Sequence, residues 1–113
     1  MFKLTNGWTK ATVLAQVKKY NNGTQAIDRE SGSCRYQVPD GNRCAIGCFI
    51  PNGHPALAYE GGSISLLNQY PELWRLMPFE SVGLGRFQSI HDTFSARGEV
   101  HQAIESFLNT EVK

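Results

Sequence analysis

The sequence predicts a mainly α-helical fold: a single small domain over residues 1–113, with four to five helices and a short hairpin or irregular insert that carries the cysteines. The chain has 113 residues, 41% of them hydrophobic, which is enough to build one core without disulfides. In several segments apolar side chains recur three to four positions apart, as they do along one face of a helix. All three cysteines lie within residues 34–51, together with a turn tripeptide. That stretch can also form strands, so an α+β arrangement stays open.

The first helix is predicted over residues 9–22. Its apolar face carries Val13, Leu14, Val17 and Tyr20. Thr9 can cap the amino end, and Asn-Asn-Gly at residues 21–23 supplies a stop. Residues 24–33 are polar and small without a sustained period, which predicts a loop.

Residues 34–51 allow two local structures. Pro39-Asp40-Gly41 suits a type I turn, because proline fixes φ and glycine accepts a left-handed conformation. Two short strands around this turn would pair Tyr36 near Cys44 and bring Cys34 near Ile46. The alternative is a loop that leads into a short helix over residues 45–50.

The second half of the chain predicts an irregular connection followed by helices. Residues 51–63 are rich in proline, glycine and asparagine, which favours a loop. A short helix is predicted from Ser63 or Ser65 through Tyr70, and another turn or two from Pro71. Longer helices are predicted from Ser81 to Gly98 and over residues 99–109, on the helical spacing of their apolar residues: Leu84, Phe87, Ile90 and Phe94, then Val100, Ala103, Ile104, Phe107 and Leu108.

Charge and hydropathy restrict the classes of partner that the sequence supports. The formal net charge is +1, so no overall field favours nucleic acid or an anionic membrane. The apolar runs are far shorter than the ~20 residues of a membrane-spanning helix, and the amino end lacks the pattern of a secretory signal. We therefore expect a cytosolic protein with no membrane partner, in which three cysteines are free thiols, metal ligands or catalytic groups.

The cysteines suggest a metal site as one reading. Cys34, Cys44 and Cys48 could supply three zinc ligands, with His91 as candidate for the fourth. However, the spacing Cys44-x3-Cys48 is wider than the close pair of common zinc fingers. Free cysteine more often packs in the core as a small hydrophobe, so no cofactor is predicted.

A thiol-dependent hydrolase or transferase is a second reading. Cys44 would lie at the start of a helix over residues 45–50, where the helix dipole favours a thiolate. His91 with Asp92 is the best candidate for the base that activates it. The alternative role of His91 is that of a boundary histidine bonded to a nearby carbonyl.

Ligand binding without chemistry is a third reading. Two guanidinium groups, a turn and two aromatic rings lie in a short span, as Arg35, Tyr36, Asp40, Gly41, Arg43 and Tyr59. Guanidinium groups pair with phosphates and stack on flat rings, so a nucleotide-like anion is a sensible ligand. The alternative is that both arginines are solvated. No phosphate loop, dinucleotide fingerprint or nucleophile elbow is present in the sequence. Whether the protein is an enzyme is left open, and the absence of these motifs favours a protein that is not one.

Two motifs resemble those of small uncharacterised proteins encoded by bacteriophages and prophages. The first is Cys-x-Tyr-x2-Pro-Asp-Gly-x2-Cys-Ala-Ile-Gly-Cys-x-Ile-Pro over residues 34–51. The second is Phe-Gln-x-Ile-His-Asp over residues 87–92, and Glu60-Gly61 lies between them. Gln37, Val38 and the tail after Gly98 depart from the pattern. The resemblance implies that the cysteine stretch and His91-Asp92 belong to one site.

The resemblance also implies a role in the cytosol of a bacterial host. The leading hypothesis is a phage accessory protein of host-interaction or anti-defence type, which binds a host protein or sequesters a nucleotide-derived signal. The alternatives are the thiol-dependent hydrolase or transferase that uses Cys44, and a small structural zinc domain. Homo-oligomer formation is left undecided by the sequence.

Overall fold

The computed structural model of the protein describes residues 1–24, 26, 35–93 and 99–113. Within these ranges the chain forms α1 (Lys10–Tyr20), α2 (Ser63–Gln69), α3 (Ser81–Thr93) and α4 (Val100–Thr110), with the 3-10 helices η1 (Gly47–Phe49), η2 (Pro55–Ala58) and η3 (Pro71–Leu76). The same ranges contain no strand and only isolated bridges. The prediction of a mainly helical small domain is therefore confirmed.

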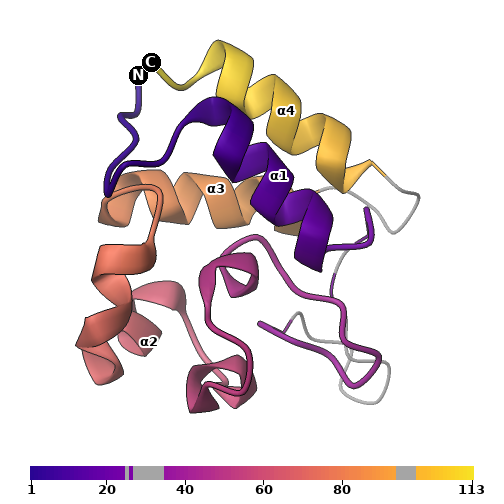
Figure 1. Ribbon diagram of the computed structural model, residues 1–113, viewed down its shortest axis with the longest axis vertical. Coiled ribbons are helices and arrows are strands. Elements are labelled where there is room, and N and C mark those ends of the chain that lie inside the picture. Colours follow the sequence, from indigo (N-terminus) through magenta and orange to yellow (C-terminus); the bar gives the residue numbers. More distant parts are fainter. Residues whose placement is uncertain (25, 27–34, 94–98) are drawn as a thin grey trace.

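Three longer helices form one side of the molecule (Figure 1). α4 packs against both α1 and α3, while α2 and η3 lie beside each other below α3. The two chain ends meet, because Phe2 forms a parallel bridge with Val112 and the Lys113 N–H donates to the Phe2 carbonyl at 2.9 Å. In the part of the chain that the structure describes, no helix is long and apolar enough to cross a membrane.

The helix predicted over residues 9–22 is present with shorter bounds, and the helix predicted over residues 99–109 is present one position later. α1 begins with a capping box. The Thr9 hydroxyl accepts from the Thr12 N–H at 3.1 Å, and the Thr12 hydroxyl accepts from the Thr9 N–H at 2.9 Å. Val13 and Val17 are fully buried, and α1 contacts both α4 and η1. α3 is described from Ser81 to Thr93, and the remainder of its predicted span lies outside the described residues.

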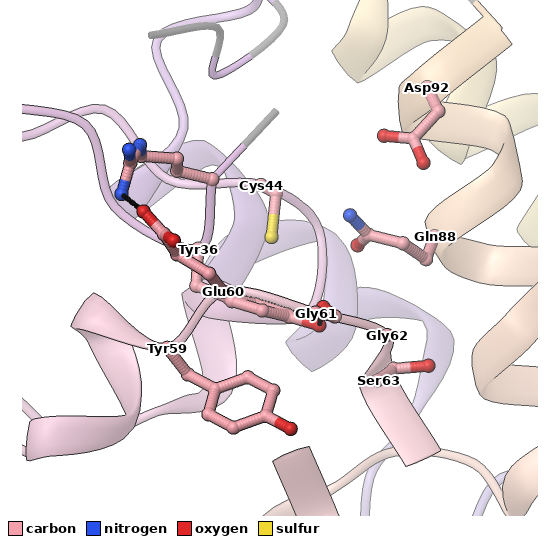
Figure 2. Close-up of a pocket in the computed structure, with 10 residues that line it drawn as sticks. Tyr36, Cys44, Tyr59, Glu60, Gly61, Gly62, Ser63, Gln88 and Asp92 are labelled. Carbon is pink, nitrogen blue, oxygen red and sulfur yellow. Dashed lines mark hydrogen bonds and ion pairs between the residues drawn. The ribbon is translucent and has the colours of Figure 1, made fainter. Parts of the chain in front are cut away.

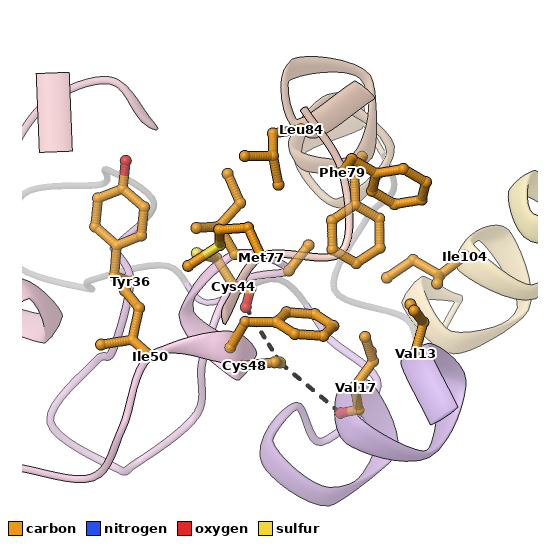
Figure 3. Packing of buried hydrophobic residues seen from close by; sticks show 14 of the residues in the cluster. Val13, Val17, Tyr36, Cys44, Cys48, Ile50, Met77, Phe79, Leu84 and Ile104 are labelled. Atoms are coloured by element: carbon orange, nitrogen blue, oxygen red, sulfur yellow. Dashed lines mark hydrogen bonds between the residues drawn. The ribbon is translucent and has the colours of Figure 1, made fainter. Parts of the chain in front are cut away.

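The core lies where α1, α3, α4 and η1 converge (Figure 3). Phe87 is its central ring, with the rings of Phe79, Phe107 and Phe49 at centroid distances of 5.5, 6.1 and 5.8 Å. These aromatic contacts come from α3, α4 and the segments beside them. They fix the position of α3 relative to residues 44–50, and this placement forms the site described below.

Residues 35–50 contain parts of the two structures that the sequence allowed, but the two predicted short strands are not formed by the described residues, which have one isolated bridge here. Gln37 and Arg43 form an antiparallel bridge, which is the predicted register with Tyr36 opposite Cys44. The turn is closed by the Gly41 N–H, which donates to the Val38 carbonyl at 2.9 Å, and Gly41 has a φ of 94°. η1 follows at once, as the helical alternative predicted. Cys34 lies outside the described residues.

One glycine lets the chain fold back on this turn. A Cβ atom at Gly47 would lie 2.0 Å from the Tyr36 carbonyl oxygen, so only glycine fits without moving the backbone. The glycine of the Cys-Ala-Ile-Gly-Cys motif therefore brings η1 against the first arm of the hairpin.

Candidate functional site

A pocket of about 360 Å³ lies between the hairpin, α3 and the loop that precedes α2 (Figure 2). The hairpin contributes Arg35, Tyr36 and Cys44 to its walls, and the loop contributes residues 59–63. The opposite wall is formed by Gln88 and Asp92 of α3. Segments that are more than 40 positions apart in the sequence therefore meet at one cavity.

Tyr36 ties the hairpin to the loop. Its side chain is buried, and its hydroxyl donates to the Gly61 carbonyl at 2.8 Å. Burial raises the pKa of this hydroxyl well above its ordinary value of 10.0, so the group stays protonated and remains a donor. At the rim, Arg35 forms an ion pair with Glu60 at 2.7 Å. These two contacts shape the loop side of the pocket.

Cys44 forms the inner end of the pocket, with its sulfur directed into it (Figure 2). The residue is 1% exposed, and the Gly47 N–H donates to Sγ at 3.3 Å. Burial raises the pKa of the Cys44 thiol to about 12, and the negative charge of Asp92 also raises it, whereas hydrogen bonds from Gly47 and Gln88 lower it. At neutral pH this sulfur is a thiol, not a thiolate nucleophile.

The α3 wall presents one amide and one carboxylate. Gln88 Oε1 accepts a hydrogen bond from the Ile46 N–H at 3.1 Å, which fixes the orientation of the amide. Asp92 follows four positions later on the same helix face, and its side chain is 46% exposed. The Asp92 Oδ1 atom lies 2.9 Å from Nδ1 of His91.

His91 supports Asp92 from the core and does not line the pocket. Its side chain is fully buried, and its Nε2 accepts from the Ala26 N–H at 3.1 Å. Because Nε2 accepts, the ring proton is on Nδ1 and is donated to Asp92. The predicted pairing of Cys44 with a His91 base is therefore not the arrangement in this structure, although Cys44 and Asp92 do share one pocket.

Three of the predicted ligand-binding residues lie away from this pocket. Arg43 is buried and donates to the carbonyls of Gly47 at 3.3 Å and Ile50 at 2.8 Å. Its guanidinium also binds the Asn52 side chain and lies 4.4 Å from the centroid of the Tyr20 ring. It therefore stabilises the turn over residues 43–52 and is not available to a ligand.

Asp40 and Gly41 form the exposed tip of the hairpin. Asp40 Oδ1 accepts from the Asn42 N–H at 2.8 Å, a typical aspartate turn contact. Neither residue lines the pocket. The predicted pair of guanidinium groups around an anion is thus reduced to Arg35, which already binds Glu60.

The cysteines do not form a metal site in the described part of the chain. Cys48 is buried away from the pocket, and its Sγ donates to the Cys44 carbonyl at 3.2 Å, beside Val17 (Figure 3). Among residues 1–24, 26, 35–93 and 99–113, no three His, Cys, Asp or Glu side chains are grouped so that they could hold a metal ion. The zinc hypothesis included Cys34, which lies outside these ranges.

Several lining residues were not predicted as site residues, above all Gln88 and Ser63. Gln88 was visible in the second motif, and its spacing of four from Asp92 places both on one helix face. That spacing is a signal that could have found Gln88. Ser63 carries no such signal, because its place depends on how the loop returns to the hairpin.

Comparisons with protein-family models, with curated proteins and with solved structures give no match to this chain. The resemblance to phage and prophage proteins therefore stays a prediction.

Proposed function

We propose that this protein acts by binding a small molecule in the pocket between the hairpin and α3, and not by catalysis. The observation that carries the proposal is a concave site of about 360 Å³ whose walls come from three separate segments. A cavity of this size, with aromatic walls and a few oriented polar groups, is typical of a site for a small ligand. The concave shape favours a small molecule over a flat protein surface.

The chemistry of the lining supports binding over reaction. Among the described residues that line the pocket, the sulfur is that of Cys44, and burial raises the pKa of its thiol to about 12. His91, the predicted base, uses Nε2 to accept from the Ala26 N–H and does not line the pocket. Nucleophilic catalysis needs both an activated nucleophile and a base within hydrogen-bond reach, and the lining residues that the structure describes supply neither.

The phage-type motifs suggest the biological setting. In that setting the protein is a phage accessory factor that sequesters a small host molecule, for example a nucleotide-derived signal. The pocket narrows this proposal, since the charged groups among its described lining residues are Arg35, which is paired with Glu60, and Asp92. A neutral or cationic ligand, or the neutral part of a larger one, therefore suits the lining better than a bare anion.

Native mass spectrometry of the purified full-length chain tests the proposal. We expect a small molecule to remain bound to the wild type and to be lost from Gly62→Phe. Gly62 lines the pocket, and a Cβ atom added there meets no atom within 4 Å, so the variant should fold while its ring blocks the site.

Gly85→Phe is the matched control, because a Cβ atom at Gly85 also meets nothing within 4 Å and Gly85 is not a lining residue. Retention of the molecule by Gly62→Phe would contradict the assignment of the pocket. A Cys44→Ala variant that folds and binds normally but has lost its activity would favour the thiol-dependent alternative.

A further inference from the structure

We propose that Asn52 is a modification site, at which the folded protein converts this asparagine into aspartate without the help of another protein. The new carboxylate would form an ion pair with the buried guanidinium of Arg43. Neither residue lines the pocket between the hairpin and α3, so the inference does not depend on the proposed function.

Arg43 is a buried cation without a described counter-charge. It is 3% exposed, and none of the carboxylates that the structure describes forms an ion pair with it. Its guanidinium donates instead to two backbone carbonyls and to Oδ1 of Asn52, which are all neutral groups. Burying a charge costs free energy unless an opposite charge compensates it. A carboxylate at position 52 would provide that compensation.

The side-chain carbonyl of Asn52 is activated by the same contact. Deamidation begins when the backbone nitrogen of the next residue attacks Cγ of the asparagine, which places negative charge on Oδ1. A cationic donor that is already directed at this oxygen stabilises the charge as it forms. The hydrogen bond from Arg43 to Oδ1 therefore lowers the barrier to the attack.

Gly53 supplies the attacking nitrogen. It has no side chain that could hinder ring closure, and both Asn52 and Gly53 are exposed to solvent. Among the residues that the structure describes, no acceptor binds the Gly53 N–H. The nitrogen can therefore approach Cγ without first breaking a described hydrogen bond.

The reaction takes place in two steps, with water as its co-reactant. First, the Gly53 nitrogen forms a bond to Cγ of Asn52 and loses its proton, and the side-chain nitrogen leaves as ammonia. The product of this step is a cyclic succinimide. Water then adds to Cγ, the bond from Cγ to the Gly53 nitrogen breaks, and that nitrogen regains a proton. The result is aspartate at position 52 with the backbone unchanged.

Two other asparagines of the chain precede a glycine, and the structure protects both. Nδ2 of Asn6, the nitrogen that would leave, donates to two backbone carbonyls at 2.8 and 2.9 Å. After Asn22, the N–H of the buried Gly23 donates to Asn21 Oδ1 at 2.7 Å, so this nucleophile is already engaged. The described contacts of Asn6 and Asn22 include no cationic donor to the side-chain oxygen.

Peptide mapping by mass spectrometry, after incubation of the full-length protein at mildly alkaline pH, tests the inference. In the folded protein we expect Asn52 to be converted at least about tenfold faster than Asn6 or Asn22. In urea the three should be converted at similar rates, because each is followed by glycine and the contacts that distinguish them are lost. Equal rates in the folded protein, or a preference for Asn52 that persists in urea, would overturn the proposal.

Arg43→Lys tests the role of the guanidinium. Lysine keeps the charge but lacks the planar fork that reaches the carbonyls and Oδ1 together. We expect the conversion of Asn52 to slow by about tenfold, while that of Asn6 in the same sample stays unchanged. Circular dichroism verifies that the variant is folded. Unchanged or faster conversion of Asn52 in a folded Arg43→Lys variant would show that the guanidinium does not promote the reaction.

Asn52→Asp reproduces the product and tests the ion pair. At pH 7 this variant should have a Tm about 4 °C above that of the wild type, because the carboxylate compensates the charge of Arg43. Asn22→Asp is the matched control and should not raise the Tm, since the side-chain oxygen of Asn22 accepts from the Thr24 N–H at 3.0 Å and from no described cation. A Tm of Asn52→Asp at or below that of the wild type would overturn the pairing with Arg43.

Discussion

The two arms of the hairpin carry one arginine each, and the two have opposite roles. Arg35 has 28% of its side chain exposed and pairs with Glu60 at the rim of the pocket. Arg43 is 3% exposed and donates to backbone carbonyls of the turn that follows it. The neighbour of Arg43, Cys44, faces the pocket, because successive side chains of an extended segment point to opposite sides. The position of a charged side chain in the packed structure, and not its type, decides whether a ligand can reach it.

Cys44 and Cys48 also differ in whether they lie at the pocket or in the core. Cys44 lines the pocket, whereas Cys48, one helical turn further on, faces α1 and donates to a backbone carbonyl. The dense motif over residues 34–51 therefore has a pocket side and a core side. Mutations on the core side should affect stability most, and mutations on the pocket side should affect binding most.

Gly47→Ala should have the largest effect, because it removes the contact that holds the two arms together. The new Cβ atom would lie 2.0 Å from the Tyr36 carbonyl oxygen, and backbone must move to relieve the clash. We expect a loss of about 4 kcal/mol in the free energy of unfolding, measured by urea denaturation. Gly85→Ala is the control, since its Cβ atom meets nothing within 4 Å and alanine should stabilise α3 by up to about 1 kcal/mol. Equal effects of the two substitutions would contradict this packing.

Arg43→Met should have the next largest effect. It leaves the carbonyls of Gly47 and Ile50 buried without their donor and removes the contact with the Tyr20 ring. We expect a loss of about 3 kcal/mol in the free energy of unfolding, measured in the same way.

The matched substitution on the other arm, Arg35→Met, should cost less than about 1 kcal/mol, because Glu60, the partner in its ion pair, is 71% exposed. A larger loss from Arg35→Met than from Arg43→Met would reverse the assignment of the two arms.

Alkaline pH should produce a smaller effect that depends on Cys44. Its pKa rises from an ordinary 9.0 to about 12 on folding, so the unfolded chain loses this proton first as the pH increases. Stability is therefore unaffected by this group below pH 9 and falls between pH 9 and 12, by about 1 kcal/mol at pH 10.

Comparing the pH dependence of unfolding for the wild type and Cys44→Ala isolates this contribution. The wild type should lose stability more steeply above pH 9. The same burial should make alkylation of Cys44 by iodoacetamide at pH 8 at least about tenfold slower than that of an exposed cysteine. Rapid labelling of Cys44 in the folded protein would instead support the thiol-dependent alternative.

The helices were predictable because their signals are local. α1 and α4 follow from the spacing of apolar residues, and the capping box of α1 involves positions only three apart. The hairpin register was predictable for the same reason, since a turn of known length fixes which residues lie opposite each other. The choice between hairpin and helix was not predictable, because an apolar run of six residues fits either. The described chain has one isolated bridge at the turn and then the short helix η1.

The site was only partly predictable. Five of the candidate residues predicted from the sequence line the pocket: Arg35, Tyr36, Cys44, Tyr59 and Asp92. Four others do not line it: Asp40, Gly41, Arg43 and His91. Nothing local distinguishes Arg35 from Arg43, because both flank the same turn. The fully buried ring of His91 likewise depends on contacts with Ala26, 65 positions away.

By itself, the sequence determined the helical class of this protein, the turn at Pro39-Asp40-Gly41 and the cluster of residues from which a site could be built. The tertiary structure decided which of those residues share a cavity. It placed Gln88 and Asp92 of α3 opposite Cys44, buried one arginine and left the other at the rim. The physical reason is that periodicity and turn chemistry act over a few residues, whereas the pocket depends on Phe79, Phe87 and Phe107 packing α3 into the core.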